Sequence, residues 1–269
     1  MSDTSTRSGM LWEVERILSE CKGLETLPQV LLMENVPQIH NQFNMPDFHK
    51  WQVRLEELGY KSYWQDLIAT DYGIPQTRNR CFMISILGDY SYTFPKPIPL
   101  KLKLKDMLED NVDEKYYLSD KIIDFFTKNE ELQKENGNGF RFNVSDGNVI
   151  AKTITTRAGS RMDDNFIKEP KVLGGLGEKK SNGGNQWYQQ DRVYDDNVAI
   201  SITTECNPYY QSNLRIRKLT PKECFRLMGV KDEDFDKICK NQSDSSLYHL
   251  AGDSIVCLGV LTSIFKELL

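Results

Sequence analysis

Hydrophobic positions in the first ninety residues alternate between stripes at helical spacing and short apolar runs. The first stripe, within residues 8–21, consists of Met10, Val14, Ile17 and Cys21. The second begins at about Pro46, ends at the stop signal Gly59, and consists of Phe48, Trp51, Leu55 and Leu58. Strands are expected at 30–33, 63–69 and 81–87. This strand–helix–strand order predicts right-handed βαβ units in a mostly parallel sheet, and therefore an α/β fold.

The pattern changes at residues 92–99, where three prolines at alternate positions predict an extended connector. A short helix is expected at about 119–126. From 140 to 211 the chain is rich in Gly, Asn and Thr, which predicts an irregular β-rich region. Two β-prone pieces there, 152–156 and 199–204, echo each other but are too short to be called a repeat.

Regular structure is expected again after residue 215. Thr220 and Glu223 fit a capping box, and Pro221 suits the first helical position, so a helix should begin here and end at Gly229. A final helix is expected to begin at Asp253 or Ser254. Its apolar positions are Ile255, Leu258, Leu261, Ile264, Phe265 and Leu268.

The composition fits a folded chain with a substantial core, because 39% of the 269 residues are hydrophobic and 27% are charged. No uninterrupted apolar stretch has the length of a membrane span, and residues 1–10 lack the apolar core of a signal peptide. We therefore expect no membrane partner. The net charge of -5 gives no general attraction to nucleic acid, so any DNA-binding surface must be a local patch.

The six cysteines are scattered, with no Cys-x-x-Cys pair and no histidines at ligand spacing. This pattern argues against a metal site and against a disulfide framework, and it favours a reducing cytoplasm. The cysteines are Cys21, Cys81, Cys206, Cys224, Cys239 and Cys257. Cys81 begins a predicted buried strand and is interpreted as an inert core thiol.

Two polar segments stand at the ends of predicted strands. Glu34 follows the first apolar run, at the carboxyl end where open α/β sheets bind ligands. Gln76, Arg78 and Arg80 are spaced by two, which in extended backbone places them on one side. These residues predict a polar site. The alternatives are that Glu34 caps the following turn and that the arginines form a solvated strand edge.

Four segments together resemble the later motifs of the DNA (cytosine-5)-methyltransferases in order and spacing. They are Glu34-Asn35-Val36, Gln76-x-Arg78-x-Arg80, Arg217-x-Leu219-Thr220-Pro221-x-Glu223-x-x-Arg226-Leu227-Met228-Gly229 and Gly252-Asp253-Ser254-Ile255-Val256. The resemblance spans nearly the whole chain and is loosest in residues 96–211. It implies the carboxyl-terminal part of a Rossmann-like, S-adenosylmethionine-dependent methyltransferase sheet with an inserted β-rich target-recognition domain. The implied limits are 1–95 for the partial catalytic domain, 96–214 for the linker and recognition domain, and 215–269 for a helical return.

The resemblance also implies roles for the polar residues. Methylation at carbon 5 of cytosine requires a thiolate to add at carbon 6, which is easier when an acid binds ring nitrogen 3 and cations face the carbonyl oxygen. Glu34 would hold nitrogen 3 and the exocyclic amine, and a dry pocket can raise the pKa of such a carboxyl. Arg80, alone or with Arg78, would face the carbonyl oxygen. Asn35 and Gln76 would bind the base, which must be flipped out of the double helix.

The implied cofactor is S-adenosylmethionine, with Asp253 and Ser254 lining its pocket. Asp253 stands where the family usually has asparagine and adds a negative charge beside the carboxylate of the cofactor. The implied macromolecular partner is double-stranded DNA. Its phosphates would be met by two locally basic stretches that contain Arg141, Lys152, Arg157, Arg161, Arg215 and Arg217. Residues 174–190 resemble the recognition region, although each could be an ordinary polar loop residue.

Two earlier family motifs have no counterpart in the chain: the glycine-rich cofactor loop and the Pro-Cys that supplies the nucleophile. None of the six cysteines follows a proline. Three interpretations remain open: one half of a split restriction–modification methyltransferase that needs an amino-terminal half, an inactive truncated fragment, or a noncatalytic DNA-binding module. Each predicts an exposed apolar patch on the first helix and strand, because part of their sheet would be missing.

Overall fold

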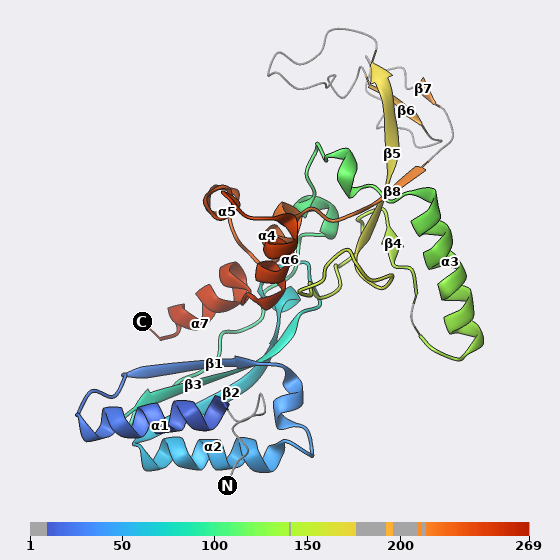
Figure 1. Cartoon of the computed structure of the whole chain (residues 1–269). Coiled ribbons are helices and arrows are strands. Elements are labelled where there is room, and N and C mark those ends of the chain that lie inside the picture. Colours follow the sequence, from blue (N-terminus) through green and yellow to red (C-terminus); the bar gives the residue numbers. More distant parts are fainter. Residues whose placement is uncertain (1–9, 140, 176–191, 196–208, 211–213, 269) are drawn as a thin grey trace. The chain divides into compact units, whose positions relative to one another are not determined.

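The computed structural model describes residues 10–139, 141–175, 192–195, 209–210 and 214–268. The chain divides into two compact units (Figure 1). The first unit contains 1–102 and 255–269, and the second contains 103–254. These limits differ from those expected at residues 95 and 214, and the functions assigned to the domains stay predictions. Most of the expected recognition region and the second β-prone echo lie outside the described residues.

The first unit contains a three-stranded sheet of β1 (Val30–Asn35), β2 (Tyr60–Ile68) and β3 (Asn79–Leu87). Its order is β1-β3-β2, and β3 runs antiparallel to both neighbours. The mostly parallel sheet that we predicted is therefore wrong for these strands. β2 is followed by only a short 3-10 turn, η3 (Ala69–Tyr72), and such a connection is too short for the crossover that parallel neighbours require.

One part of the βαβ prediction is nevertheless correct. β1 and β2 both run antiparallel to β3, so they are parallel to each other, and α2 (Met45–Glu57) connects them. The helix α2 begins and ends within one residue of the expected limits, and Gly59 adopts a φ of +99° where the stop was predicted.

Both faces of this sheet are covered. On one face, α1 (Met10–Gly23) and α2 pack over a core of Leu18, Phe48, Trp51, Leu55, Tyr60, Cys81 and Met83. On the other face, Phe82 and Ile84 are buried. There the connector after β3 and the last helix α7 (Thr262–Lys266) meet, since the Tyr92 hydroxyl donates to the carbonyl of Ile264 over 3.3 Å. The first unit is therefore a layered α/β structure.

The apolar stripe predicted for α1 does not face this core. Leu18 is buried, whereas Val14 and Ile17 are 43% and 47% exposed. β1 is an edge strand among the described residues, and Val30 at its start is 38% exposed. We call Val14, Ile17, Val30 and the outer edge of β1 the α1–β1 surface. Apolar side chains are thus exposed on both α1 and β1, but the sequence could not tell which of two apolar stripes of α1 packs against this sheet.

The second unit is built around the long strand β5 (Phe166–Gly175), which pairs antiparallel with β8 (Leu214–Lys218) and β6 (Arg192–Asp195). The short strands β4 (Val144–Ser145) and β7 (Tyr209–Tyr210) complete this sheet. The helix α3 (Asp120–Glu135) extends beyond the predicted short helix and packs Phe126 against Phe142 and Phe166. The strands β4, β5, β6 and β7 lie within the described part of the region that was expected to be irregular and β-rich.

Three helices follow β8: α4 (Pro221–Leu227), α5 (Asp232–Ile238) and α6 (Asp244–Asp253). The capping box of α4 is confirmed, because Thr220 and Glu223 each bond the backbone of the other. The helix expected to begin at Asp253 or Ser254 is a wrong prediction. Asp253 instead ends α6, and Ser254 is extended with a ψ of 160°.

The chain becomes helical again only in a π-type segment, Cys257–Leu261, which leads into α7. Leu258 and Gly259 have non-helical angles, and Gly259 has a φ of +87°. The stretch Asp244–Lys266 is long and apolar enough for a membrane span, but it is broken at these residues. Buried core helices meet the same criterion, so the stretch is weak evidence for a span.

Gly259 provides a test of the packing of the first unit. A Cβ atom there would lie 2.3 Å from the carbonyl oxygen of Tyr72, at a φ that L-residues rarely adopt. We expect Gly259→Ala to destabilise the unit by at least about 1–3 kcal/mol, the usual cost of such backbone strain. Urea unfolding followed by tryptophan fluorescence measures this. Gly23→Ala, where a Cβ meets nothing within 4 Å, is the control, and equal stability of the two variants would contradict the packing.

Candidate functional site

The antiparallel pairing of β1 with β3 brings Glu34 and Arg80 together. Glu34 at the end of β1 lies opposite Phe82, and Arg80 is two residues before Phe82, on the same face of the sheet. Arg80 Nε lies 3.0 Å from Glu34 Oε1, with the two side chains 19% and 20% exposed. The sequence thus identified a real juxtaposition, although the strand directions that produce it differ from those predicted.

The other residues of the predicted site differ in burial and in their bonds. Gln76 and Arg78 are 0% and 4% exposed, whereas Thr77 between them is exposed. A solvated strand edge is therefore excluded for Arg78. Asn35 Oδ1 accepts a hydrogen bond of 2.8 Å from the amide of Val36, so the side chain that bonds this turn is Asn35. The capping alternative for Glu34 is not supported, because its carboxylate pairs with Arg80.

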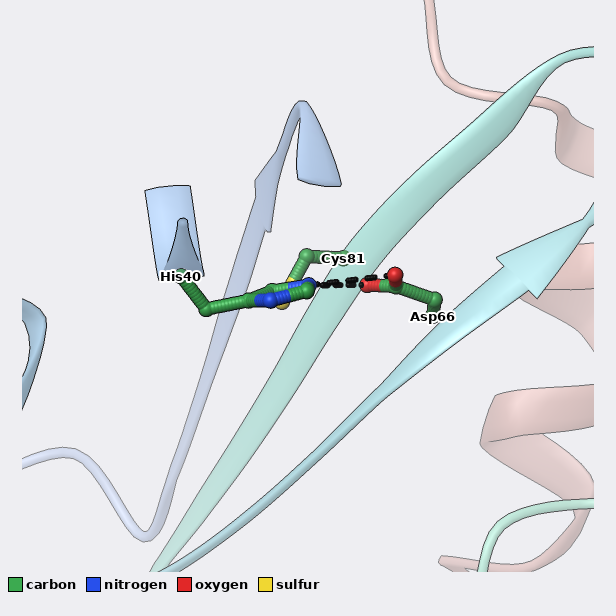
Figure 2. A group of neighbouring side chains, drawn as sticks. All are labelled: His40, Asp66 and Cys81. Atoms are coloured by element: carbon green, nitrogen blue, oxygen red, sulfur yellow. Dashed lines mark hydrogen bonds and ion pairs between the residues drawn. The ribbon is translucent and has the colours of Figure 1, made fainter. Parts of the chain in front are cut away.

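A second polar group of the first unit was not foreseen from the sequence (Figure 2). His40 Nε2 lies 2.9 and 3.0 Å from the two carboxylate oxygens of Asp66. Ligand atoms of His40, Asp66 and Cys81 lie within 4.8 Å of one another. These residues stand in separate elements, so sequence spacing gave no signal.

The chemistry of this group favours a structural role over a metal site. Metals bind the thiolate form of cysteine, but burial, and next Asp66, raises the pKa of Cys81 to about 12. The Asp66 carboxylate is already occupied by His40, whose ring lies 4.9 Å from that of Trp64. Cys81 is fully buried, as expected of an inert core thiol.

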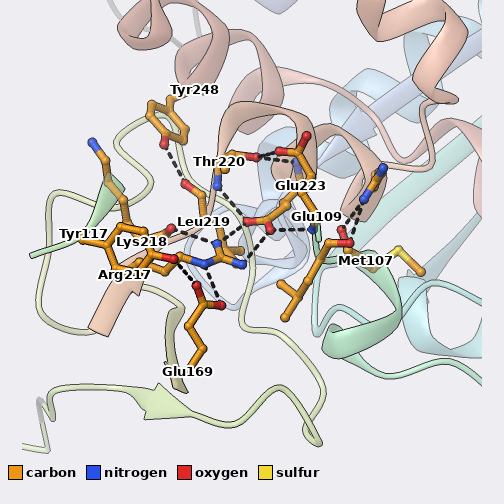
Figure 3. A network of polar contacts seen from close by, with 12 residues as sticks. Met107, Glu109, Tyr117, Glu169, Arg217, Lys218, Leu219, Thr220, Glu223 and Tyr248 are labelled. Carbon is orange, nitrogen blue, oxygen red and sulfur yellow. Dashed lines mark hydrogen bonds and ion pairs between the residues drawn. The ribbon is translucent and has the colours of Figure 1, made fainter. Parts of the chain in front are cut away.

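The second unit is organised by a buried ion-pair network around Arg217 (Figure 3). Arg217 donates two hydrogen bonds, of 2.8 and 2.9 Å, to the two carboxylate oxygens of Glu223, and both side chains are 0% exposed. Arg217 Nε lies 3.0 Å from Glu169 Oε2. Glu223 also accepts from the amides of Thr220 and Glu109, over 2.8 and 2.9 Å. Burial opposes the charge of Arg217, but Glu223 outweighs it, so the pKa of Arg217 is raised.

This network corrects the expected role of Arg217 as a DNA contact. A fully buried guanidinium bound to two carboxylates cannot meet a phosphate. Arg215 is 24% exposed, pairs with Glu114, and stacks at 3.7 Å over the ring of Tyr117. Arg215 and Arg217 of this basic cluster therefore bind carboxylates within the second unit and have a mainly structural role. The spacing from Arg217 to the capping residue Glu223 was visible in the sequence, but the burial of both was not.

The other four residues expected to contact DNA are accessible. Arg141, Lys152, Arg157 and Arg161 are all exposed in the second unit. Arg157 and Arg161 stand in a turn after Thr155, and the Lys152 ammonium donates to the carbonyl of Asp163 over 3.1 Å. Their exposure agrees with the predicted DNA contacts without testing them.

The residues expected to line a cofactor pocket fit that role poorly. The Asp253 carboxylate lies 3.1 Å from His249 Nδ1 and is 61% exposed, and the Ser254 hydroxyl donates to the carbonyl of Ala251 over 2.9 Å. Neither residue is poised to bind a ribose or an amino acid. Gly252 is packed tightly, since a Cβ there would lie 2.2 Å from the amide nitrogen of Thr156. These residues by themselves do not form an S-adenosylmethionine site.

The Arg217 network gives a second testable consequence. Arg217→Ala leaves Glu223 buried without its cation, and we expect a loss of about 3–5 kcal/mol in the free energy of unfolding. Arg215→Ala, which removes a partly exposed partner of Glu114, should cost no more than about 1 kcal/mol. Chemical denaturation followed by far-ultraviolet circular dichroism compares the two. A loss below about 1 kcal/mol for Arg217→Ala would contradict this role.

Comparison with known proteins places these motifs in one family. The family model for C-5 cytosine-specific DNA methylases matches residues 2–269. The type II methyltransferase M2.ScrFI of Lactococcus lactis subsp. cremoris is 35% identical over all of this chain, which covers 60% of that relative. M.NlaX of Neisseria lactamica is 28% identical over 98% of this chain and 68% of its own length.

Solved structures agree on the fold. The Dnmt2 methyltransferase of S. pombe has a TM-score of 0.62 at 16% identity, covering 97% of this chain and 71% of that protein. The Entamoeba histolytica methyltransferase EhMeth has the same TM-score and identity, covering 99% and 71%. The chain spans about 60% of the length of its Lactococcus relative. With its family motifs in order, this chain belongs to the C-5 cytosine-specific DNA methylase family.

Proposed function

We propose that this chain is the base-holding part of a DNA (cytosine-5)-methyltransferase, which transfers a methyl group from S-adenosylmethionine to carbon 5 of a flipped cytosine. The observation that carries the proposal is the Glu34–Arg80 pair, 3.0 Å apart on neighbouring strands. Both residues occupy motif positions of the family to which the chain belongs. The first unit is then the carboxyl-terminal part of the Rossmann-like sheet, and the second unit contains the target-recognition domain.

The pair suits the charge changes of this reaction. Addition of a thiolate at carbon 6 places negative charge on nitrogen 3 and the carbonyl oxygen of the ring. Glu34 would hold nitrogen 3 and the exocyclic amine, and the fixed guanidinium of Arg80 would stabilise the carbonyl oxygen. Arg80 is held on a strand next to Glu34, so both groups are oriented before the base arrives. Asn35, Gln76 and Arg78 complete the walls of the proposed base site.

None of the six cysteines follows a proline, so we propose that the nucleophile comes from another polypeptide segment. Burial raises the pKa of Cys81 to about 12, and burial also raises the pKa values of Cys224 and Cys257. Thiols of this kind are poor nucleophiles at neutral pH. We propose that the attacking thiolate and most of the cofactor site belong to a polypeptide segment equivalent to the part of the Lactococcus relative that this chain does not match. In that proposal, Asp253 and Ser254 only border the cofactor.

The α1–β1 surface is the proposed docking site for that segment. Val14 and Ile17 are about half exposed, and the outer edge of β1 is unpaired among the described strands. A groove of about 410 Å³ joins α1 to the end of β1, with Trp12 and Val36 among its lining residues. A strand added along β1 would satisfy the free backbone groups and cover the apolar side chains. This surface ends beside Glu34, where the attacking thiolate would be required.

Double-stranded DNA is the proposed substrate. Arg141, Lys152, Arg157 and Arg161 are exposed in the second unit and suit phosphate contacts. We also propose a restriction–modification role, because the curated relatives include type II methyltransferases.

The first experiment measures methyl incorporation into DNA from labelled S-adenosylmethionine. We expect none from this chain alone and measurable transfer after mixing with the unmatched segment of M2.ScrFI. In the mixture, Glu34→Gln should lower the rate by roughly 10²–10⁴-fold, because general acid catalysis is lost. Glu56→Gln, on an exposed position of α2, is the control. Transfer by the chain alone, or an unchanged rate for Glu34→Gln, would sink the proposal.

A second experiment tests the docking surface. The double variant Val14→Ser and Ile17→Ser should weaken association with the M2.ScrFI segment at least about tenfold, since burial of both side chains would be lost. Because both are already half exposed, circular dichroism of the isolated chain should not change. Ile122→Ser, a 43%-exposed position on α3, is the matched control. Equal affinities for all three proteins, measured by calorimetry, would place the docking site elsewhere.

A further inference from the structure

A turn of the second unit, residues 155–164, is closed by a buried carboxylate. Asp164 is 8% exposed, and its Oδ2 accepts hydrogen bonds from the amides of Ser160 and Arg161 over 3.1 and 2.9 Å. The amide of Ser160 also lies 3.1 Å from the carbonyl of Arg157. The backbone that carries Arg157 and Arg161 is therefore tied to one acid beneath it.

The next residue ties a third cation to the same turn. Asn165 is 6% exposed, its Oδ1 accepts from the amide of Lys152 over 2.8 Å, and its Nδ2 donates to the carbonyl of Lys152 over 2.9 Å. Lys152 thus has its backbone held by both ends of one amide. Two adjacent buried polar residues consequently fix the backbone positions of three exposed cations.

The turn is also packed tightly against its surroundings. Gly159 has a φ of +79°, and a Cβ there would lie 2.7 Å from Cδ of Lys218. Gly252 in α6 leaves no room for a side chain, since a Cβ would lie 2.2 Å from the amide nitrogen of Thr156. These contacts limit the movement of the turn, and a turn held on two sides presents its side chains in a defined direction.

A buried acid under a basic turn has a cost that needs an explanation. Desolvation penalises the carboxylate and raises the pKa of Asp164, while the amides of the turn oppose that rise. An apolar residue at this position would avoid the penalty but would leave the two amides without acceptors. The arrangement therefore favours a fixed backbone over maximal stability, which is useful where cations must meet a ligand of regular spacing.

We propose that Asp164 and Asn165 are positioning residues of a preorganised phosphate-binding element, in which Lys152, Arg157 and Arg161 contact the backbone of DNA. This inference rests on the proposed function. Phosphate is the ligand that suits such exposed cations, and its spacing along DNA is fixed. Asp164 acts through the turn and not through its own charge, which would repel DNA.

A positioning role and a purely electrostatic role of Asp164 predict opposite changes in DNA affinity when the acid is removed. The test is binding of the full chain to a fluorescent 30-base-pair duplex between 50 and 200 mM salt. Removing an acid by itself should strengthen DNA binding. We expect Asp164→Ala to weaken it about tenfold at low salt and to reduce the slope of log affinity against log salt by about 0.9 for each cation that loses its phosphate. Asp164→Asn keeps an acceptor oxygen and should retain the slope. Asp163→Asn removes a neighbouring charge, keeps the backbone carbonyl that Lys152 contacts, and leaves the Asp164 bonds in place, so it should bind at least as tightly as wild type.

Two further variants keep the test decisive if Asp164→Ala unfolds. Asn165→Ala should release only Lys152 and lower the slope by about 0.9. The double variant Arg157→Ala and Arg161→Ala should lower it by about 1.8.

Three outcomes would overturn the proposal in distinguishable ways. If the double arginine variant weakens binding but Asp164→Ala and Asn165→Ala do not, the positioning role is wrong. If wild type binds DNA and the arginine variant has an unchanged slope, the turn is not a DNA contact, although the methyltransferase proposal survives. If wild type binds no duplex, even when mixed with the M2.ScrFI segment, the proposed function fails together with this inference.

Discussion

The antiparallel insertion of β3 between β1 and β2 is the constraint on which the proposed site depends. In an antiparallel pair, the carboxyl end of one strand meets the amino end of its neighbour. Glu34 ends β1 and Arg80 begins β3, so this direction alone brings the acid and the guanidinium to 3.0 Å. If β1 and β3 were parallel, Glu34 and Arg80 would lie at opposite ends of the two strands. The short connection after β2 is therefore as important for the site as the charged residues themselves.

In the second unit, buried ion pairs hold an irregular, polar region in a defined conformation. Arg217 and Glu223 supply a fully buried framework that also begins α4. A buried pair of this kind is poor evidence of extra stability, since desolvation offsets most of the attraction, but loss of one partner is costly. Asp164 is a second buried acid, and it accepts hydrogen bonds from backbone amides of the turn that carries Arg157 and Arg161. Glu223 and Asp164 therefore fix the backbone around them, and the exposed cations remain available for other contacts.

The sequence predicted much of the local structure because short-range chemistry determines it. The capping box at Thr220, the stop at Gly59 and the apolar strand ending at Glu34 all follow from neighbouring residues. Sheet direction and the buried face of α1 depend on long-range packing, which periodicity cannot encode. The role of Arg217 was missed for the same reason, because an arginine within a basic cluster gives no sign of burial. The break at Gly259 reflects a close approach of Tyr72, nearly two hundred positions earlier in the chain.

The proposed function requires Glu34 to hold ring nitrogen 3 of a flipped cytosine. The most direct measurement is the ¹⁵N chemical shift of that nitrogen in a labelled target cytosine, within DNA bound to this chain and the M2.ScrFI segment. We expect an upfield shift in the wild-type complex, typical of a nitrogen that accepts a strong hydrogen bond or a proton, and the loss of this shift in Glu34→Gln. A shift equal to that of free DNA in the wild-type complex would contradict it.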